Sequence, residues 1–477
     1  KSIRPSYLIQ EMQRLFSGLE IEDEEKQAFS AQEWTPRLGM QKVIRGFQDG
    51  NAMDQEWQEL YSWYKRQPQW QYRVEELMKS GFYTRPADGL TKEVAKQLYG
   101  EHFQDSITRI ERFSACAFAH FLTYGLRLRE RQIYEFQPID LGNVCHSALE
   151  YYSRKLKEEH LSWTEIEEEK RQEYIDDSVE HAISDYGNSV LYSSARNEYM
   201  IERMKRLLTR TIWALTKQLE AGDFVPVAYE MRFENGKIDR VDLCKDKDKV
   251  YVKVLDYKTG SKAFDVVALY HGLQLQLMVY MDAAVKMTQK HYPDSEVIPA
   301  GVFYYRLNDP LVEKKVVGEE EEIWQKVLKE LKVDGVMNLK DETLEHLDHC
   351  QVGESAVIPV KYNKNGSLSK NSKVASEQEF EVMMRHALGK VLKVHRKILS
   401  GEVAAFPYRR KQESGCDYCA YRHICGFDQK IPGYKYRDIF EMTQSEVIAA
   451  MEADAVKENV NRDDHEKEQE KGTGSWE

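Results

Sequence analysis

Several features that define common protein classes are missing from this sequence of 477 residues. No run of 18 apolar residues occurs, which argues against a membrane-spanning helix, and Lys1–Pro5 begins no secretory signal. The missing initiator Met leads us to expect a piece of a longer protein. No G-x-x-x-x-G-K-S/T motif is present, so the chain carries no intact ATP-binding P-loop. Basic residues do not prevail: 68 Lys and Arg against 80 Asp and Glu exclude binding to nucleic acid by bulk charge, although not by a local basic channel.

Cysteine is scarce and unevenly spaced. The seven Cys residues are an odd number, which argues against a secreted disulfide framework and for an intracellular protein that uses some thiols as ligands. Apolar residues are plentiful, because 42% of the chain is hydrophobic and 11% is aromatic. Such a fraction supports a sizeable core and excludes global disorder.

Apolar periodicity predicts helices in several stretches of the chain. Residues 1–105 are expected to be helical with an aromatic core, and a base-stacking surface is the alternative. A charged helical insertion, expected to be solvated, falls at about 155–222. The other predicted helices are 106–130, 141–157, 196–220, 319–333 and 377–400.

The period changes to that of strands after residue 223. Phe224–Glu234, Lys237–Cys244 and Val250–Tyr257 are predicted strands joined by hairpin-like turns. A helix is expected from about Val266 to Lys286, followed by a strand at Val297–Arg306. Helices on both sides of such strands predict an α/β class.

Two carboxylates and a lysine are expected at one end of these strands. Alternation places Asp256 and Lys258 on one sheet face and Tyr257 on the other. Asp239 lies on the preceding strand, where a neighbour of Asp256 is expected. Carboxylates brought together repel unless a cation lies between them, and Mg²⁺ prefers oxygen ligands. A Lys beside metal-bound water can orient or deprotonate it, so the set suits phosphodiester hydrolysis, although D-x-K alone is more often a solvated surface pair.

The surrounding motifs resemble those of the PD-(D/E)XK nucleases, specifically the RecB-type branch. G-x-I-D ends at Asp239, D-x-K follows one hairpin later, and Gln276 and Tyr280 form Q-x-x-x-Y. Upstream, the segment from Gly142 to His146 is similar to the helical G-x-x-x-H motif of that branch, whose His is a metal ligand. The resemblance implies an α/β nuclease core, with a mixed central sheet flanked by helices, helical insertions and a preceding mostly helical segment.

The same resemblance implies roles for the candidate residues. Mg²⁺, or Mn²⁺, is expected to be held by His146, Asp239, Asp256 and the main-chain carbonyl of Tyr257. Lys258 is expected to position the attacking water. The expected braces of this Lys, or contacts to the DNA backbone, are Gln276 and Tyr280.

Two further carboxylates lie on the same strands. Glu230 could face the site or be an ordinary strand residue, and the sequence leaves this open. Asp242 is three residues from Asp239, so we expect it on the opposite face of the sheet. Asp239 is therefore preferred as the ligand.

The C-terminal cysteines form a strong metal-binding pattern. Cys416 and Cys419 form C-x-x-C, and Cys425 follows. A structural zinc site needs a fourth ligand, which His423 could supply; the other candidate is Cys116, 300 positions upstream.

A subset of RecB-type nucleases has one Cys before the core and three after it, which together bind a 4Fe–4S cluster. The E-R-F-x-x-C-x-F segment around Cys116 and the motif of Cys416, Cys419 and Cys425 resemble that arrangement, with Ala117 where Pro is frequent. The resemblance therefore implies these four ligands. The remaining thiols are expected to be core residues, namely Cys145, Cys244 and Cys350.

Residues 238–242 and 270–276 most resemble the AddB-type subunits of bacterial AddAB helicase–nucleases. This resemblance implies an inactivated helicase-like region ending at residue 105, an Fe–S-stapled nuclease over 106–430 and an extension over 431–477. The charged tail after about Asp454 is expected to be disordered.

The expected function is Mg²⁺-dependent cleavage of the 5′-terminated DNA strand during double-strand-break repair by recombination. Single-stranded DNA and an AddA-like subunit are the expected partners, in the bacterial cytoplasm and without a membrane. A non-catalytic Fe–S scaffold that guides single-stranded DNA and a freestanding Fe–S nuclease are the alternatives. The presence of two carboxylates beside a Lys argues against the scaffold.

Overall fold

The computed structural model describes residues 6–19, 34–48, 55–84, 89–100, 106–129, 131, 138–191, 194–234, 236–312, 320–350 and 352–457. The chain forms two compact units, one of Lys1–Pro86 with Asp428–Tyr434 and one of Ala87–Phe427 with Lys435–Glu477. No helix within the described ranges has the length and apolarity needed to cross a membrane. The expected disorder of the tail concerns residues 458–477, which lie outside the described residues.

The smaller unit is built on the helices α2 (Pro36–Gln48), α3 (Gln55–Arg66) and α4 (Pro68–Gly81), and α1 (Tyr7–Leu15) also belongs to it. Pro68 starts α4 at a position where the missing N–H costs no helical hydrogen bond. The buried core of the three helices consists of Met40, Val43, Trp57, Tyr64 and Val74. These rings are inside the unit, so the predicted aromatic core is confirmed.

The larger unit contains a mixed sheet, as the sequence predicts. Its described strands are ordered β1 (Val225–Phe233), β2 (Gly236–Asp246), β3 (Lys249–Lys258), β4 (Glu296–Arg306), β5 (Asp334–Asn338) and β6 (Val374–Ala375). β1, β2 and β3 are antiparallel neighbours, whereas β3 pairs with β4 in parallel. Parallel neighbours need a crossover, which α11 (Val266–Tyr270) and α12 (Gln276–His291) provide.

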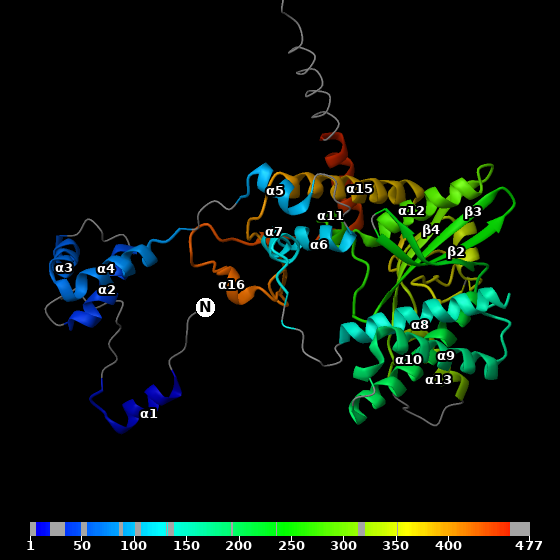
Figure 1. Ribbon diagram of the computed structural model, residues 1–477, viewed down its shortest axis with the longest axis horizontal. Helices are drawn as coiled ribbons and strands as arrows, with labels where there is room; N and C mark the ends of the chain where they lie inside the picture. Colours follow the sequence, from blue (N-terminus) through cyan, green and yellow to red (C-terminus); the bar gives the residue numbers. More distant parts are fainter. Residues whose placement is uncertain are drawn as a thin grey trace, which may run out of the picture. The chain divides into compact units, whose positions relative to one another are not determined.

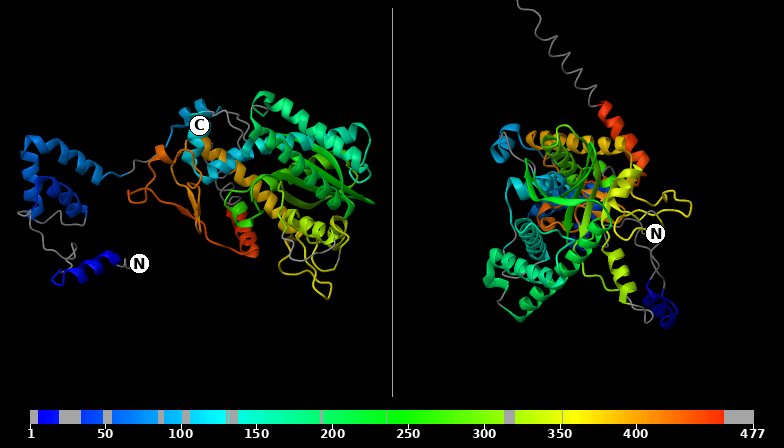
Figure 2. Two further views of the ribbon diagram at one scale, coloured as in Figure 1. Left: turned by 90° about the horizontal axis from the view of Figure 1, so that it is seen from below. Right: turned by 90° about the vertical axis from the view of Figure 1, so that its right-hand side faces the viewer.

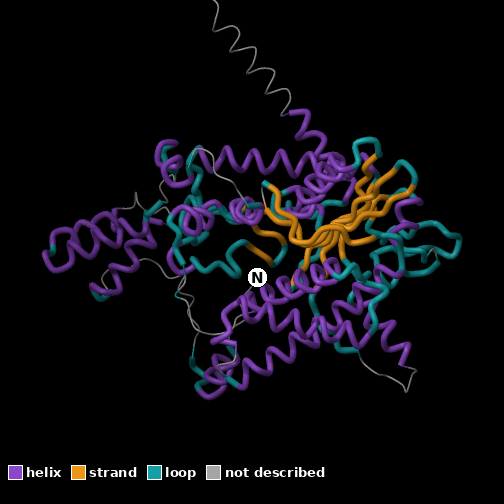
Figure 3. Tube along the Cα trace, turned by 45° about the vertical axis from the view of Figure 1, so that its right-hand side comes forward, coloured by secondary structure: helices purple, strands orange, loops and turns teal. Residues whose placement is uncertain are grey.

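Helices cover both faces of this sheet (Figures 1, 2 and 3). One layer consists of α8 (Pro138–Glu158), α9 (Glu168–Leu191) and α10 (Ala195–Glu220), and α12 and α15 (Glu377–Leu399) lie on the other face. Each layer has its own large buried apolar cluster. α5 (Lys92–Tyr99) buries Ala95 and Tyr99 in the second cluster. The compact unit therefore includes residues upstream of the boundary at 105 that the sequence suggested.

Two predicted helices are interrupted. The helix expected over 106–130 becomes α6 (Ile107–Ala115), α7 (Ala117–His120) and a π-helical turn at Phe121–Gly125, because Cys116 is extended with φ −167° and ψ 115°. The helix expected over Val266–Lys286 stops after α11 and restarts as α12. Gly272 lies in this break with φ +79°, a conformation that favours glycine.

The insertion is not simply solvated, contrary to the sequence-based expectation. Ile175, Val179 and Ile183 of α9 are buried, as is Trp163 in the preceding loop. The spacing of four residues places these apolar groups on one helical stripe among many charges. The insertion therefore packs on α8 and α10 and extends the core of the unit.

Candidate active site

The carboxylates meet where β2 and β3 part. The last backbone pair between the strands is Arg240 with Leu255, and Asp239 and Asp256 are the next residues on each strand. Asp239 Oδ2 accepts a hydrogen bond from the N–H of Tyr257 at 2.7 Å. The end of the ladder thus frees one main-chain donor, which orients the Asp239 carboxylate.

Asp256 is the most deeply buried carboxylate of the site, with 1% of its surface exposed. Burial, and then the charge of Asp239, raise the pKa of Asp256 to about 6, although Lys258 opposes this shift. Lys258 Nζ contacts the Asp256 carboxylate. Alternation on β3 therefore brings this acid and this base to one face, as the D-x-K spacing indicates.

His146 reaches the same carboxylates from α8, the helix that contacts β1. Its Nδ1 lies 3.4 Å from Asp239 Oδ2, and its ring contacts that of Tyr257 edge-on at 5.7 Å between centroids. Burial by itself lowers the pKa of His146, but the hydrogen bond and charge of Asp239 outweigh it, so the net pKa is raised. The histidine and both carboxylates thus form one electrostatic group.

Glu230, which the sequence left open, belongs to this group. It lies on β1 between the pairs Tyr229–Arg240 and Met231–Ile238, across from Asp239. Ligand atoms of His146, Glu230 and Asp239 all lie within 4.8 Å of one another. Glu230 has φ +49°, an uncommon conformation for a non-glycine residue, of a kind that clusters at functional sites.

The Q-x-x-x-Y residues lie one helical turn apart on α12. Gln276 Nε2 donates to the Tyr280 hydroxyl at 2.8 Å. Burial raises the pKa of Tyr280, and the charges of Asp256 and Asp239 contribute, which shows that its hydroxyl is near the carboxylates. The helix therefore carries a neutral donor pair to the site.

Glu111 fixes the start of α12, a function that the sequence did not reveal. Its Oε1 accepts hydrogen bonds from the N–H groups of Leu275 at 2.8 Å and Gln276 at 3.2 Å. A carboxylate is well suited to the unpaired N–H groups of a helix start. Lys262 Nζ lies 3.6 Å from the other Glu111 oxygen. The only signal in the sequence was an acidic residue in the E-R-F-x-x-C segment.

Asp242 faces away from this site. It pairs with Arg240, at 2.6 Å from Nε to Oδ1, and with Lys253, at 2.9 Å from Nζ to Oδ2. All three are buried, and the Arg240 guanidinium lies over the ring of Trp163. Asp242 is thus held in a structural ion network, and the preference for Asp239 agrees with this geometry.

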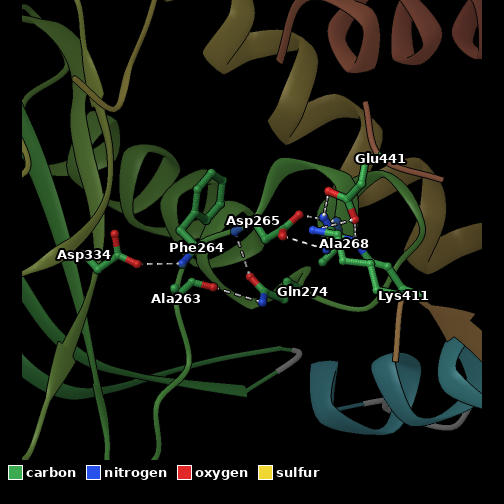
Figure 4. A network of polar contacts seen from close by, with 9 residues as sticks. Ala263, Phe264, Asp265, Ala268, Gln274, Asp334, Lys411 and Glu441 are labelled. Carbon is green, nitrogen blue, oxygen red and sulfur yellow. Dashed lines mark hydrogen bonds and ion pairs between the residues drawn. The ribbon is translucent and has the colours of Figure 1, made fainter. Parts of the chain in front are cut away.

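The loop after Lys258 is tied to the C-terminal segment (Figure 4). Asp265 accepts from the N–H of Ala268 at 2.9 Å and pairs with Arg410 at 2.6 Å. Arg410 also binds Glu441 at 2.8 Å. Further hydrogen bonds of the loop join Phe264 to Asp334, Asp265 to Gln274 and Gln274 to Ala263. The segment between Lys258 and α12 is therefore fixed from two sides.

Four cysteines converge in one apolar cavity. Cys116, Cys416, Cys419 and Cys425 line it together with Phe118, Ala119, Ala405, Pro407 and Phe427. Burial, and then the neighbouring thiols with Cys116 first, raise the pKa of Cys416 to about 11. Arg112 lies 4.0 Å from the sulfur of Cys419, and the N–H of Phe427 points to Cys425 Sγ at 3.4 Å. Such N–H and cationic groups suit thiolate-ligated iron–sulfur clusters.

His423 does not join the thiols. It is exposed and is not among the described residues that line the cavity. The Cys₃His zinc alternative therefore lacks its fourth ligand. Of the four described sulfurs, no three lie within 4.8 Å of one another, whereas ligands of tetrahedral zinc at ~2.3 Å would be about 3.8 Å apart.

Comparison with known proteins gives two family matches. Residues 104–426 match the PD-(D/E)XK nuclease superfamily, and residues 40–80 match the ATP-dependent helicase/deoxyribonuclease AddB fifth domain. The first match covers more than half of the chain.

Bacterial relatives extend over almost the whole chain. The AddB-type subunit of the ATP-dependent helicase/deoxyribonuclease from Lachnoclostridium phytofermentans is 38% identical over 94% of this chain, and that from Clostridium perfringens is 32% identical over 92%. The protein of the same name from Caldanaerobacter subterraneus is 31% identical over 92%. The chain spans about 40% of the length of each of these relatives.

Proposed function

The chain belongs to the PD-(D/E)XK nuclease superfamily and is a homologue of the AddB-type subunits, and from this we propose that it is a Mg²⁺-dependent DNA exonuclease. The observation that carries the proposal is the carboxylate pair at the parting of β2 and β3. Asp239 and Asp256 are 9% and 1% exposed, respectively. Keeping two such carboxylates charged is costly unless a cation is bound.

The donors present fit a hard divalent cation. His146, Asp239, Asp256 and the main-chain carbonyl of Tyr257 would hold Mg²⁺, and Glu230 offers a further carboxylate next to His146 and Asp239. When bound, the ion neutralises charge on the scissile phosphate and acidifies a water molecule.

The protein side chains then supply position and proton handling. Lys258 would hold the attacking water and steady the charge that develops on the phosphate, because its ammonium lies at the Asp256 carboxylate. Gln276 and Tyr280 would brace Lys258 or contact the DNA backbone, since their side chains are joined to each other. Glu111 would act one step removed, by positioning the start of α12.

The four thiols support a proposed 4Fe–4S cluster. A cluster at Cys116, Cys416, Cys419 and Cys425 would tie α6 to the C-terminal segment. It would close the unit around the nuclease site without taking part in the chemistry. Their wide spacing and the apolar cavity favour a cluster over zinc.

The names of the relatives extend the proposal to a larger machine. We infer that this chain acts in the bacterial cytoplasm with an AddA-like helicase–nuclease subunit on DNA double-strand ends. It would cut the 5′-terminated strand during processing for homologous recombination. The homology to AddB-type proteins supports this assembly.

The proposal is tested with single-stranded DNA labelled at one end and with Mg²⁺. Wild-type chain should release nucleotides, Asp256→Ala should abolish release while iron content stays normal, and Asp294→Ala, at an exposed turn, should behave as wild type. Undiminished cutting by Asp256→Ala would refute this site. No cutting by the wild type would favour the scaffold alternative, and release only from 3′-terminated strands would refute the strand assignment.

A further inference from the structure

A second group of metal-ligand side chains lies on the opposite face of the sheet from the nuclease site. Asp223 follows α10, Cys244 is on β2, and His346 lies in the last turn of α14 (Asp341–Leu347). Cys244 is five residues beyond Asp239, or about 16 Å along the strand at ~3.3 Å per residue. An odd separation places the two side chains on opposite faces, so this group is independent of the nuclease site.

The ligand atoms already converge. Single ligand atoms of Asp223, Cys244 and His346 all lie within 4.8 Å of one another. His346 Nδ1 is 2.7 Å from Asp223 Oδ2, and His349 Nε2 is 3.1 Å from Asp223 Oδ1. Two imidazoles, one thiol and one carboxylate therefore gather around one point from three separate parts of the chain.

The backbone is built to bring these parts together. The N–H of Asp223 donates to the carbonyl of His346, and the N–H of His349 donates to that of Ala221, each at 2.8 Å. A Cβ at Gly222 would lie 2.4 Å from the His346 carbonyl oxygen, so only glycine allows this approach. The ring of His346 also packs against that of Tyr251, the cross-strand partner of Cys244. The position of each side chain is therefore supported before any ligand binds.

We propose that Asp223, Cys244, His346 and His349 form a structural zinc site. Zinc accepts N, S and O ligands in tetrahedral geometry, whereas Mg²⁺ and Ca²⁺ prefer oxygen alone. The carboxylate and the thiolate would balance the two charges of the ion. The site would join the end of α10 and the end of α14 to β2, and thus fasten the helical insertion to the sheet.

Cys244 distinguishes this site from a simple Asp–His hydrogen-bonded group. The thiol is 4% exposed, and burial, followed by the charges of Asp223 and Asp246, raises its pKa to about 11. It therefore keeps its proton until a metal displaces it. The hydrogen bonds between Asp223 and the two histidines do not need Cys244, but zinc binding does.

The test measures zinc and iron per chain by mass spectrometry after purification with zinc in the medium. Wild type should hold one zinc, and Cys244→Ser and His346→Gln should each lose at least nine tenths of it with iron unchanged. Cys350→Ser and His291→Gln are matched controls, because both residues are exposed, and should keep zinc. Absence of zinc from the wild type, or its retention in both ligand variants, would overturn the proposal.

The zinc K-edge spectrum identifies the ligands even if a variant folds poorly. One sulfur and three nitrogen or oxygen neighbours are expected in the wild type. A spectrum with four sulfur neighbours would place zinc in the cysteine cavity and overturn the proposal. The nuclease rate is not used as a readout, so failure here leaves the nuclease proposal untouched.

Discussion

At the residue scale, Asp256 links the nuclease site to stability. Its pKa is raised from 3.8 to about 6, first by burial and then by Asp239, so the folded protein favours the neutral acid. Relative stability from this group is present below pH 3.8 and is lost as the pH rises through 6. Above pH 6 the charged carboxylate therefore destabilises the fold unless a cation is bound.

Asp256→Asn should accordingly stabilise the chain at pH 8 without divalent metal. The pKa shift of roughly 2 units corresponds to at most about 3 kcal/mol, and the gain should fade between pH 6 and pH 4. Thermal unfolding at several pH values measures it, with Asp294→Asn as an exposed control. A lower unfolding temperature of Asp256→Asn at pH 8 would contradict this electrostatic account.

Lys258 should affect turnover more than metal binding. Lys258→Ala is expected to lower the cleavage rate by about 10²–10⁴-fold, the usual size of an acid–base or positioning effect. Mg²⁺ titration of single-turnover rates should show a nearly unchanged midpoint. Lys286→Ala is the control, since Lys286 is exposed and pairs with Asp282 on its own helix. A shifted midpoint with normal turnover at saturating Mg²⁺ would reassign Lys258 to metal binding.

At the element scale, the start of α12 depends on a carboxylate from another helix. Glu111→Ala removes the acceptor of two N–H groups and should cost about 1 kcal/mol of stability, as loss of a helix cap does. The nuclease rate should also fall, because Gln276 and Tyr280 lose their anchor.

The conservative variant separates the two effects of Glu111. Glu111→Gln keeps an oxygen acceptor and should retain most of the stability and the rate. Thermal unfolding and single-turnover cleavage report both, and Glu381→Ala, at an exposed position on α15, is the control. Equal losses in Glu111→Ala and Glu381→Ala would refute the anchoring function.

At the scale of the whole molecule, the cysteine cavity joins distant parts of the chain. Closing a loop of 100 residues is worth about 4.7 kcal/mol in the chain-entropy model, and longer loops slightly more. The proposed cluster would close a loop of 300 residues, so Cys116→Ala and Cys419→Ala should both lose the brown colour and become protease-sensitive within 106–427.

Three other thiols serve as controls for this prediction. Cys145→Ala, Cys244→Ala and Cys350→Ala should keep the colour and the protease resistance, because none of them lines the cavity among the described residues. Iron content, absorption near 400 nm and limited proteolysis give the readouts. Full iron in Cys116→Ala, or its loss in Cys350→Ala, would show that the fourth ligand is assigned wrongly.

The sequence by itself predicted the elements whose pattern is local. Strands expected at Lys237–Cys244 and Val250–Tyr257 correspond to β2 and β3 within a few residues. Alternation along a strand is dictated by backbone geometry, so the shared face of Asp256 and Lys258 followed from spacing alone. The mixed α/β class and the family resemblance followed from the same motifs.

Tertiary packing alone decided the remainder. The break at Gly272 lies against Ser114 of α6, whose Oγ would be 2.8 Å from a Cβ at that position. Glu230 reaches His146 only because α8 packs at β1, and Glu111 meets α12 across the layers. The meeting of Cys116 with the C-terminal thiols likewise joins residues 300 positions apart. Periodicity reports which face a residue occupies, whereas its distant neighbours are set by how the layers pack, and that depends on the whole chain at once.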